Sequence, residues 1–334
     1  MILRKKMFTL VLSIALGVGF SSVSMAEVLL KASHQWPGGK GDIRDEMVQM
    51  IATQVAADNV GVKIQVYPGK SLYKPKEQWG AIVKGKLDIT AFPLAYAAGR
   101  HPEFNLTLMP GLVKNHEHAQ RLDKSAFMDR IKAIMDKAGV IVLADTWLAG
   151  GFVSKKKCVL DPSDVKGQTF RAAGKAFNEM VAGAGASITS MPSSEIYSGL
   201  QTGVLDGANT SSASLVSYRI YEQVTCLTAP GENALWFMYE PILMSKKSFN
   251  RLNKAQQQAI LAAGKKAEQF AYEGAKKADE TLVKTYKDHG VKVVTMNAEQ
   301  FKAWQEIAKR TSYKDFVEKV KDGQQLLDMA LSVK

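Results

Sequence analysis

Two short stretches decide the fold because they repeat one pattern at distant places in the chain. One reads Gly203-Val204-Leu205-Asp206-Gly207-Ala208, and the other reads Gly85-Lys86-Leu87-Asp88-Ile89. Each follows a helical segment that ends at a glycine, and each leads into an apolar segment typical of a strand. The repetition predicts two similar α/β lobes in tandem.

The residues that lead up to Gly85-Lys86-Leu87-Asp88-Ile89 predict alternating strands and helices. Alternating or apolar runs predict strands at 28–33, 62–67 and 87–91, and apolar residues on one face predict helices at 42–58 and 76–84. An order of strand, helix, strand, helix, strand is typical of an α/β lobe with a largely parallel sheet.

The pattern starts again further along the chain. Strands are expected at 140–144, 169–172 and 204–208, and helices at 176–183 and from 193 to Gly203. The boundary between the lobes is expected near Trp147 to Gly151, where Gly150-Gly151 could form a flexible crossing. We therefore predict one lobe from residues 27–148 and 237–276 and the other from 149–236 and 277–334.

The last third of the chain is mostly helical. Residues 253–289 predict one helix, with Gly264 and Gly274 as its weak points, followed by a strand at 291–294 and helix at 298–320. At 1.5 Å per residue the first helix would be roughly 50 Å long, enough to run across both lobes. We expect it to brace them.

The N-terminus has the features of a secretory signal peptide. Arg4, Lys5 and Lys6 precede an apolar run from Met7 to Phe20, and Ser24-Met25-Ala26 offers small residues before a cut at Glu27. A run of about 14 residues is too short for a membrane core, which needs roughly 20. We expect residues 1–26 to be removed and the mature chain to be periplasmic.

Charge and cysteine content exclude some functions. The net charge is +12, and the three basic residues of the signal peptide leave +9 on the mature chain. Lysines are spread along helices without interleaved aromatics, which favours a solvated basic surface over a nucleic-acid site. Cys158 and Cys226 are the only cysteines, so they form either a disulfide or two buried thiols, and we expect no zinc site and no cofactor.

Two motifs in order resemble one family of transport proteins. Asp164-Val165-Lys166-Gly167-Gln168-Thr169-Phe170-Arg171 is followed by Met191-Pro192-Ser193-Ser194-Glu195-Ile196-Tyr197-Ser198-Gly199-Leu200-Gln201-Thr202-Gly203-Val204-Leu205-Asp206-Gly207. Both are similar to motifs of the solute-binding subunits of tripartite ATP-independent periplasmic (TRAP) transporters, the DctP-type family. The resemblance covers essentially the whole mature chain. It implies a two-lobed periplasmic binding-protein fold with hinged α/β domains and a bridging helix. It also implies docking on the small and large membrane subunits of a sodium-driven permease.

Arg171 is the expected ligand anchor. In the family, the arginine of this motif pairs with the ligand carboxylate. A guanidinium is planar, always charged and presents a fork of donors that fits a carboxylate bidentately. Arg171 also lies in a short apolar strand, where it needs a ligand or a protein carboxylate as partner. A structural salt bridge is the alternative.

The other expected contacts surround this arginine. Asn209 and Thr210 follow Asp206-Gly207, where the family places a ligand-contacting side chain, although they could also cap a helix. Gln35 is a further polar candidate. Aromatic side chains in or near loops and crossings could form apolar walls, or simply core; they are Trp36, Phe92, Tyr96, Trp147, Trp236 and Phe237.

The ligand class follows from one departure from the family pattern. Some members, notably those for sialic acid, carry a second arginine about twenty residues before the position of Arg171, and residues 150–154 contain none. A monocarboxylate such as a 2-oxo, 2-hydroxy or aromatic acid is therefore favoured over a C4-dicarboxylate or sugar acid. Delivery to an ATP-driven permease or a sensor kinase stays open. Hydrolase, P-loop and zinc-protease motifs do not occur, so we expect no enzyme.

Overall fold

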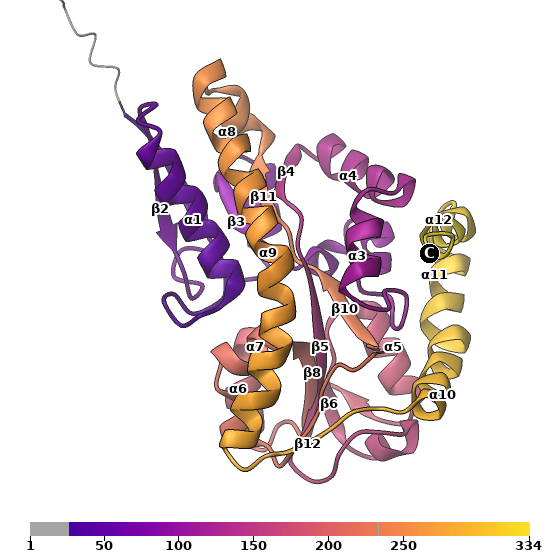
Figure 1. Cartoon of the computed structure of the whole chain (residues 1–334). Coiled ribbons are helices and arrows are strands. Elements are labelled where there is room, and N and C mark those ends of the chain that lie inside the picture. Colours follow the sequence, from indigo (N-terminus) through magenta and orange to yellow (C-terminus); the bar gives the residue numbers. More distant parts are fainter. Residues whose placement is uncertain (1–26, 233) are drawn as a thin grey trace, which may run out of the picture.

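The structure divides into two lobes, each built on its own sheet (Figure 1). It is a computed structural model that describes residues 27–232 and 234–334. The predicted signal peptide lies outside the described residues. Within them, no helix is long and apolar enough to cross a membrane.

The first sheet has five strands in the order β2-β1-β3-β11-β4. Strands β1, β2 and β3 run parallel, and β11 returns from the other lobe and pairs antiparallel with β3 and β4. The strands are β1 (Val28–Ser33), β2 (Val62–Tyr67), β3 (Ile89–Ala91), β4 (Val140–Ala144) and β11 (Ile242–Ser245).

The second sheet is more mixed. Its order is β12-β9-β5-β8-β6-β7, with β10 also paired to β5. Strand β6 runs parallel to β7 and β8, whereas β5 is antiparallel to β8, β9 and β10. The strands are β5 (Trp147–Ser154), β6 (Thr169–Arg171), β7 (Ser187–Ile188), β8 (Gly207–Ser211), β9 (Cys226–Thr228), β10 (Trp236–Tyr239) and β12 (Lys292–Val294).

The repeated sequence pattern has the same structural role in both lobes. Gly85 and Gly203 adopt left-handed φ angles of 71° and 77°, which a glycine tolerates without strain. Asp88 then accepts a hydrogen bond from the backbone N–H of Lys31, and Asp206 accepts one from that of Thr169, at 2.8 and 2.9 Å. Because each carboxylate holds the neighbouring strand, β3 and β8 both begin directly after the aspartate.

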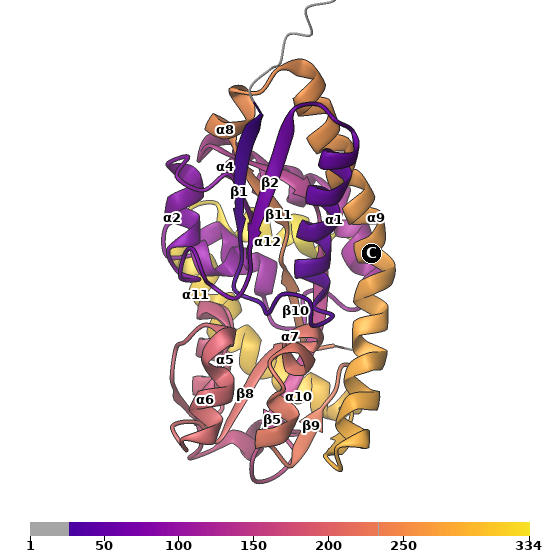
Figure 2. The ribbon, with the colours of Figure 1, turned by 90° about the vertical axis from the view of Figure 1, so that its left-hand side faces the viewer.

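The helices cover the two sheets, and one of them spans both lobes. Helix α9 (Lys254–Asp288) is capped by Asn253 and packs against α1, β4 and β5 before it reaches β12. Figure 2 shows it running beside both sheets. The other helices are α1 (Ile43–Ala57), α2 (Gln78–Val83), α3 (His116–Asp123), α4 (Ala126–Lys137), α5 (Gly174–Gly183), α6 (Ile196–Gln201), α7 (Ser212–Ser217), α8 (Lys246–Asn250), α10 (Ala298–Ala308), α11 (Lys314–Lys319) and α12 (Gly323–Leu331).

The expected flexible crossing at Gly150-Gly151 is wrong. Both glycines lie inside β5 and are paired with β8. A Cβ on Gly150 would come closer than 3.0 Å to the carbonyl of Thr210 and to Trp236, and one on Gly151 would meet the carbonyl of Thr228. These residues are glycines because neighbouring backbone lies against them.

Two further contacts tie distant segments together. Cys158 and Cys226 form a disulfide, with their Cα atoms 5.1 Å apart, which resolves the alternatives left open by the sequence. The C-terminal helices α11 and α12 contribute Phe316, Leu326 and Leu327 to a core cluster that also contains Phe104 and Trp147. The division into residue ranges predicted above stays a proposal.

Candidate ligand site between the two lobes

Arg171 ends β6 and is buried, with 1% of its surface exposed. Its Nε donates to the Met191 carbonyl at 3.0 Å and its Nη1 to the Asn209 carbonyl at 2.6 Å. Its Nη2 donates to the Tyr96 hydroxyl at 2.9 Å. No salt bridge to Arg171 forms within residues 27–232 and 234–334. A guanidinium has five N–H groups, so one remains free on each terminal nitrogen.

Tyr96 brings the opposite lobe to this arginine. It belongs to a 3-10 turn, Leu94–Ala97, that follows β3. Its hydroxyl oxygen accepts from Arg171 and, at 3.1 Å, from the backbone N–H of Ser193. Two donors of the second lobe thus converge on one oxygen of the first, and the hydroxyl hydrogen is left to donate elsewhere.

The two polar candidates on β8 face in opposite directions. Asn209 accepts from the backbone N–H of Ala173 through its side-chain oxygen at 3.0 Å. Its buried Nδ2 has no partner among the described residues. Thr210 is the next residue in the strand, so its side chain points to the other face of the sheet. The helix cap expected of this segment is Ser211, which caps α7.

A second buried arginine, Arg44, was missed by the sequence analysis. It lies in the first turn of α1, and its guanidinium is 3.9 Å from the ring centre of Trp36. Nε and Nη2 bind Asp42, Nη1 binds Glu240 at 2.5 Å, and the remaining donors bind Ser211 and Ser214. All five N–H groups are therefore used. The sequence does contain a signal for this site, because Arg44 lies at the positive N-terminal end of a helix. A cation in that position is unfavourable unless acidic partners lie nearby.

The Arg44 network joins the lobes. Asp42 also accepts from Ser217 of α7 at 2.7 Å, and the Trp36 indole donates to Ser214 at 3.2 Å. Glu240 lies where β10 leads into β11, and its own N–H donates to the Thr146 carbonyl on the other crossing. Burial raises the pKa of Glu240, while Arg44, and less strongly Arg171, act in the opposite direction.

The remaining predicted residues are all buried. Gln35 is buried, and neither atom of its side-chain amide has a partner within the described part of the chain, while its carbonyl accepts from Tyr218. Phe92 packs edge-on against Tyr96, and Trp236 covers Gly150. Phe92 and Trp236 belong to core clusters, and so do Trp147 and Phe237. The indole of Trp147 donates to Asp123, and Phe237 packs on His116.

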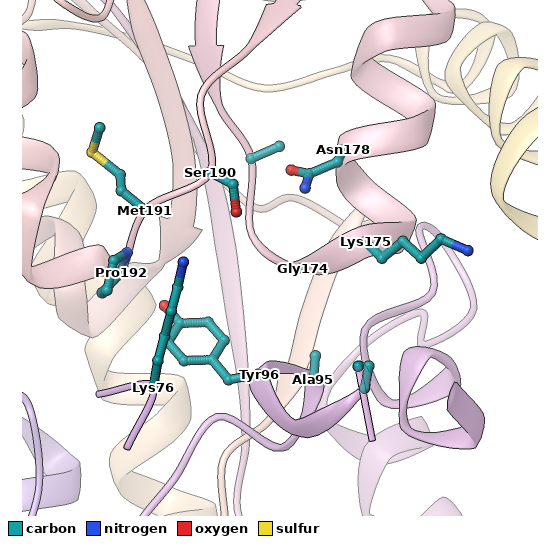
Figure 3. Close-up of a pocket in the computed structure, with 12 residues that line it drawn as sticks. Lys76, Ala95, Tyr96, Gly174, Lys175, Asn178, Ser190, Met191 and Pro192 are labelled. Atoms are coloured by element: carbon teal, nitrogen blue, oxygen red, sulfur yellow. The ribbon is translucent and has the colours of Figure 1, made fainter. Parts of the chain in front are cut away.

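A pocket of about 310 Å³ lies between the turn that carries Tyr96 and the loop after β7 (Figure 3), and Arg171 itself is not one of its lining residues. Tyr96 and Met191, which both bind the Arg171 side chain, line it. Lys76 stands next to Tyr96 on the side of the first lobe, and α5 and the loop after β7 close the opposite side. The labelled lining residues are Lys76, Ala95, Tyr96, Gly174, Lys175, Asn178, Ser190, Met191 and Pro192.

Two lobes with a bridging helix and a buried guanidinium between them define the class of periplasmic binding proteins. Residues 39–319 match the family described as bacterial extracellular solute-binding protein, family 7, known as DctP. The chain belongs to this family, and the predicted resemblance to TRAP solute-binding subunits is confirmed.

Individual relatives agree with this assignment. The chain is 39% identical to a solute-binding protein of Albidiferax ferrireducens, over 90% of both chains. A TRAP periplasmic solute-binding protein from Rhodoferax ferrireducens, solved with bound malonate, has a TM-score of 0.87 and 38% identity, over 91% of this chain and 98% of that one. DctP7 of Bordetella pertussis, an extracytoplasmic receptor binding pyroglutamic acid, has a TM-score of 0.83 and 25% identity, over 91% and 99%. The predicted two-lobed α/β fold with a bridging helix is confirmed.

Proposed function

We propose that this protein captures a small monocarboxylate in the periplasm and delivers it to the membrane subunits of a TRAP transporter. The observation that carries the proposal is the donor count of Arg171. Its two free N–H groups lie on its two terminal nitrogens, which is the arrangement that binds both oxygens of one carboxylate. The removal of residues 1–26 on export is part of the same proposal.

The charge of the site supports one carboxylate rather than two. Arg44 has no N–H left for a ligand, because Asp42, Glu240, Ser211 and Ser214 take all five. Of the two buried arginines among the described residues, Arg171 is then the one with N–H groups to spare. A second carboxylate on the ligand would have to pair with one of the more exposed lysines.

The rest of the ligand would meet neutral groups. The Nδ2 of Asn209, whose carbonyl binds Arg171, is buried and lacks a partner among residues that the structure describes. The same holds for the amide of Gln35 and the hydroxyl of Ser212, whose chain neighbours Trp36 and Ser211 belong to the Arg44 network. Buried polar atoms of this kind are costly unless something satisfies them. They suit the oxo or hydroxyl oxygen of a 2-oxo or 2-hydroxy acid, and Tyr96, which lines the pocket, suits an aromatic acid.

A short dicarboxylate is the second candidate. The relative from Rhodoferax ferrireducens carries malonate. Lys76 and Lys175 line the pocket beside Arg171 and could pair with a second carboxylate. Lys175 already binds Asp315 and Glu179, which leaves Lys76 as the better partner.

A thermal-shift panel on protein stripped of ligand tests the proposal. The panel contains lactate, pyruvate, pyroglutamate and benzoate as monocarboxylates, and malonate, succinate and galacturonate as the alternatives. An acid present at 100 times its Kd stabilises the fold by about 2.7 kcal/mol. We expect the largest shift from a monocarboxylate. A larger shift from malonate or succinate would favour the second candidate, and no shift from any acid would contradict both.

We also propose that the protein binds its ligand without converting it. The acid that gives the largest shift is incubated with the protein and then analysed by proton NMR. We expect the spectrum of the acid to be unchanged, and turnover would contradict the assignment as a binding protein.

A further inference from the structure

A second groove, which we call the basic groove, lies next to the pocket on the first lobe. It encloses about 550 Å³ between the loop before α2, the end of α2 and the turn that carries Tyr96. Four cationic side chains line it, Lys76, Lys84, Lys86 and Arg100, against a single carboxylate, Glu77.

The charge of the basic groove is not compensated. All four cations are exposed, and none forms a salt bridge in the described portion of the chain. Elsewhere many cations are paired: Lys132 with Asp145, Lys246 with Asp136, and Lys276 with Glu117. Glu77 turns toward the backbone N–H of Lys74. A concave surface with several unpaired charges of one sign raises the local concentration of small ions of the opposite sign.

The basic groove continues into the pocket beside Arg171. The two share Lys76, Tyr96 and Gly99 as lining residues. Tyr96 in turn binds the guanidinium through its hydroxyl. Positive side chains therefore line the basic groove and, through Lys76 and Lys175, the pocket, and Tyr96 of the pocket binds the buried guanidinium of Arg171.

We infer that the basic groove is the approach route of the anionic ligand and sets the rate at which it reaches Arg171. This inference rests on the proposed function, because it assumes that the ligand is a carboxylate bound at Arg171. The groove acts on the encounter between protein and ligand, whereas Arg171 and its neighbours hold the ligand afterwards. Loss of charge in the groove should therefore lower the association rate constant and leave the dissociation rate constant unchanged.

The test compares two triple variants with the same change in net charge. The groove variant carries Lys84→Gln, Lys86→Gln and Arg100→Gln, none of which lines the pocket. The control variant carries Lys254→Gln, Lys287→Gln and Lys302→Gln, three exposed residues on α9 and α10. Binding is followed by stopped-flow tryptophan fluorescence with malonate, or with the acid of largest thermal shift if malonate does not bind.

We expect the groove variant to bind about fivefold more slowly than wild type at low ionic strength. Its dissociation rate should stay within about twofold, and the difference in association should vanish at about 0.5 M salt, where screening is nearly complete. The control variant should match wild type. Equal association rates in the two variants, or a loss that persists at high salt, would overturn the inference while leaving the proposed function intact. A wild-type protein that binds no acid of the panel would overturn both.

Discussion

At the scale of single residues, two buried arginines, which both lie near Glu240, differ in their partners. Arg44 is bound by two carboxylates and two hydroxyls. Arg171 is bound by two carbonyls and one hydroxyl, so its charge has no counter-ion in direct contact among the described residues. The partners, rather than the burial that both share, determine which arginine is available to an anion.

Replacing Arg171 tests its role as anchor. Truncating one partner of a buried charged pair costs about 2–5 kcal/mol, so Arg171→Ala should weaken ligand binding by at least about tenfold. Arg171→Lys should also bind poorly, because an ammonium cannot form the bidentate contact. Affinity is measured by calorimetry with the best acid of the panel. Arg130→Ala, at an exposed position, is the control, and an unchanged Kd for Arg171→Ala would exclude this anchor.

Replacing Arg44 should affect stability. Arg44→Ala leaves Asp42 and Glu240 buried without their cation, which typically costs about 3–5 kcal/mol. The free energy of unfolding is measured in urea, with Arg130→Ala expected within about 0.5 kcal/mol of wild type. Adding Glu240→Gln to Arg44→Ala should recover part of the loss, because one uncompensated charge is removed. A loss below about 1 kcal/mol in Arg44→Ala would contradict this account.

Asp123 should make stability depend on pH. Burial, together with the nearby Asp145, raises the pKa of Asp123 well above its ordinary value, although Trp147 and Tyr272 donate to it. The folded protein thus holds this proton more tightly than the unfolded chain. Its contribution is complete below the unfolded pKa of about 4 and is lost as pH rises through the folded pKa.

The variant Asp123→Asn removes this titration and keeps the acceptor for Trp147. Urea unfolding is measured at pH 4.5 to 8. The free energy of unfolding of the variant should rise relative to that of wild type by up to about 1.4 kcal/mol per pH unit, until Asp123 is ionised in the folded wild type. Glu103→Gln, an exchange at a less buried acid, should show no such trend. A constant difference between Asp123→Asn and wild type across this range would be evidence against a raised pKa.

At this scale, sequence reasoning predicted some residues that the structure places together. Arg171, Tyr96 and Asn209 were predicted, and in the structure Arg171 binds both the Tyr96 hydroxyl and the Asn209 carbonyl. Arg44 was missed because its partners Ser211, Ser214 and Glu240 lie more than 160 residues away. Trp147 and Phe237 were predicted from their place near the crossings, and only packing reveals that they lie in the core.

At the scale of elements, the role of Gly264 in α9 differs from the prediction based on helix propensity. Gly264 was expected to be a weak point of the helix, since glycine is unfavourable in helices. In the structure a Cβ at this position would come closer than 3.0 Å to the carbonyl of Leu143 in β4. The glycine lets the long helix lie directly on the strand that precedes the first crossing.

Gly264→Ala should therefore destabilise the fold despite the better propensity of alanine. We expect a loss of about 1–3 kcal/mol, as for other overpacked positions. The matched control is Gly80→Ala in α2, where no described atom lies within 4 Å of the added Cβ and a gain of up to about 1 kcal/mol is expected. Thermal unfolding followed by circular dichroism measures both. A more stable Gly264→Ala variant would mean that α9 can move away from β4 at little cost.

The element boundaries were predictable where local signals decide them. Strands β1, β2 and β4 were predicted at their observed residues, and α9 has its caps at Asn253 and His289. The start of β8 was set three residues too early, because Asp206 turns back to hold Thr169 in a neighbouring strand. A contact across 37 residues leaves no local trace in the sequence.

At the scale of the whole molecule, the disulfide joins the segment after β5 to β9. It closes a loop of 68 residues, for which the chain-entropy model gives about 4 kcal/mol. We expect Cys158→Ala with Cys226→Ala to lower the free energy of unfolding by about 2–5 kcal/mol. Dithiothreitol should destabilise wild type by a similar amount and leave the double variant unaffected. Equal unfolding curves with and without reductant would argue against the bond.

The architecture was predictable from the sequence because the same strand-turn pattern occurs in both halves and the long helix has strong local signals. The strand pairing that links the lobes was not predictable, because β10 and β11 cross between the sheets and pair residues about 90 to 150 positions apart. The cysteine pairing was equally open until the fold brought Cys158 and Cys226 together.

The bond from Tyr96 to Arg171 has a consequence for the order of events in uptake. Its hydroxyl belongs to one half of the molecule, and the guanidinium and the Ser193 amide that it satisfies belong to the other. If the lobes open, Arg171 loses the bond to Tyr96 and has three N–H groups free for a ligand carboxylate. When the lobes close, Tyr96 binds Arg171 again, and the bound ligand then shares the guanidinium with the tyrosine hydroxyl.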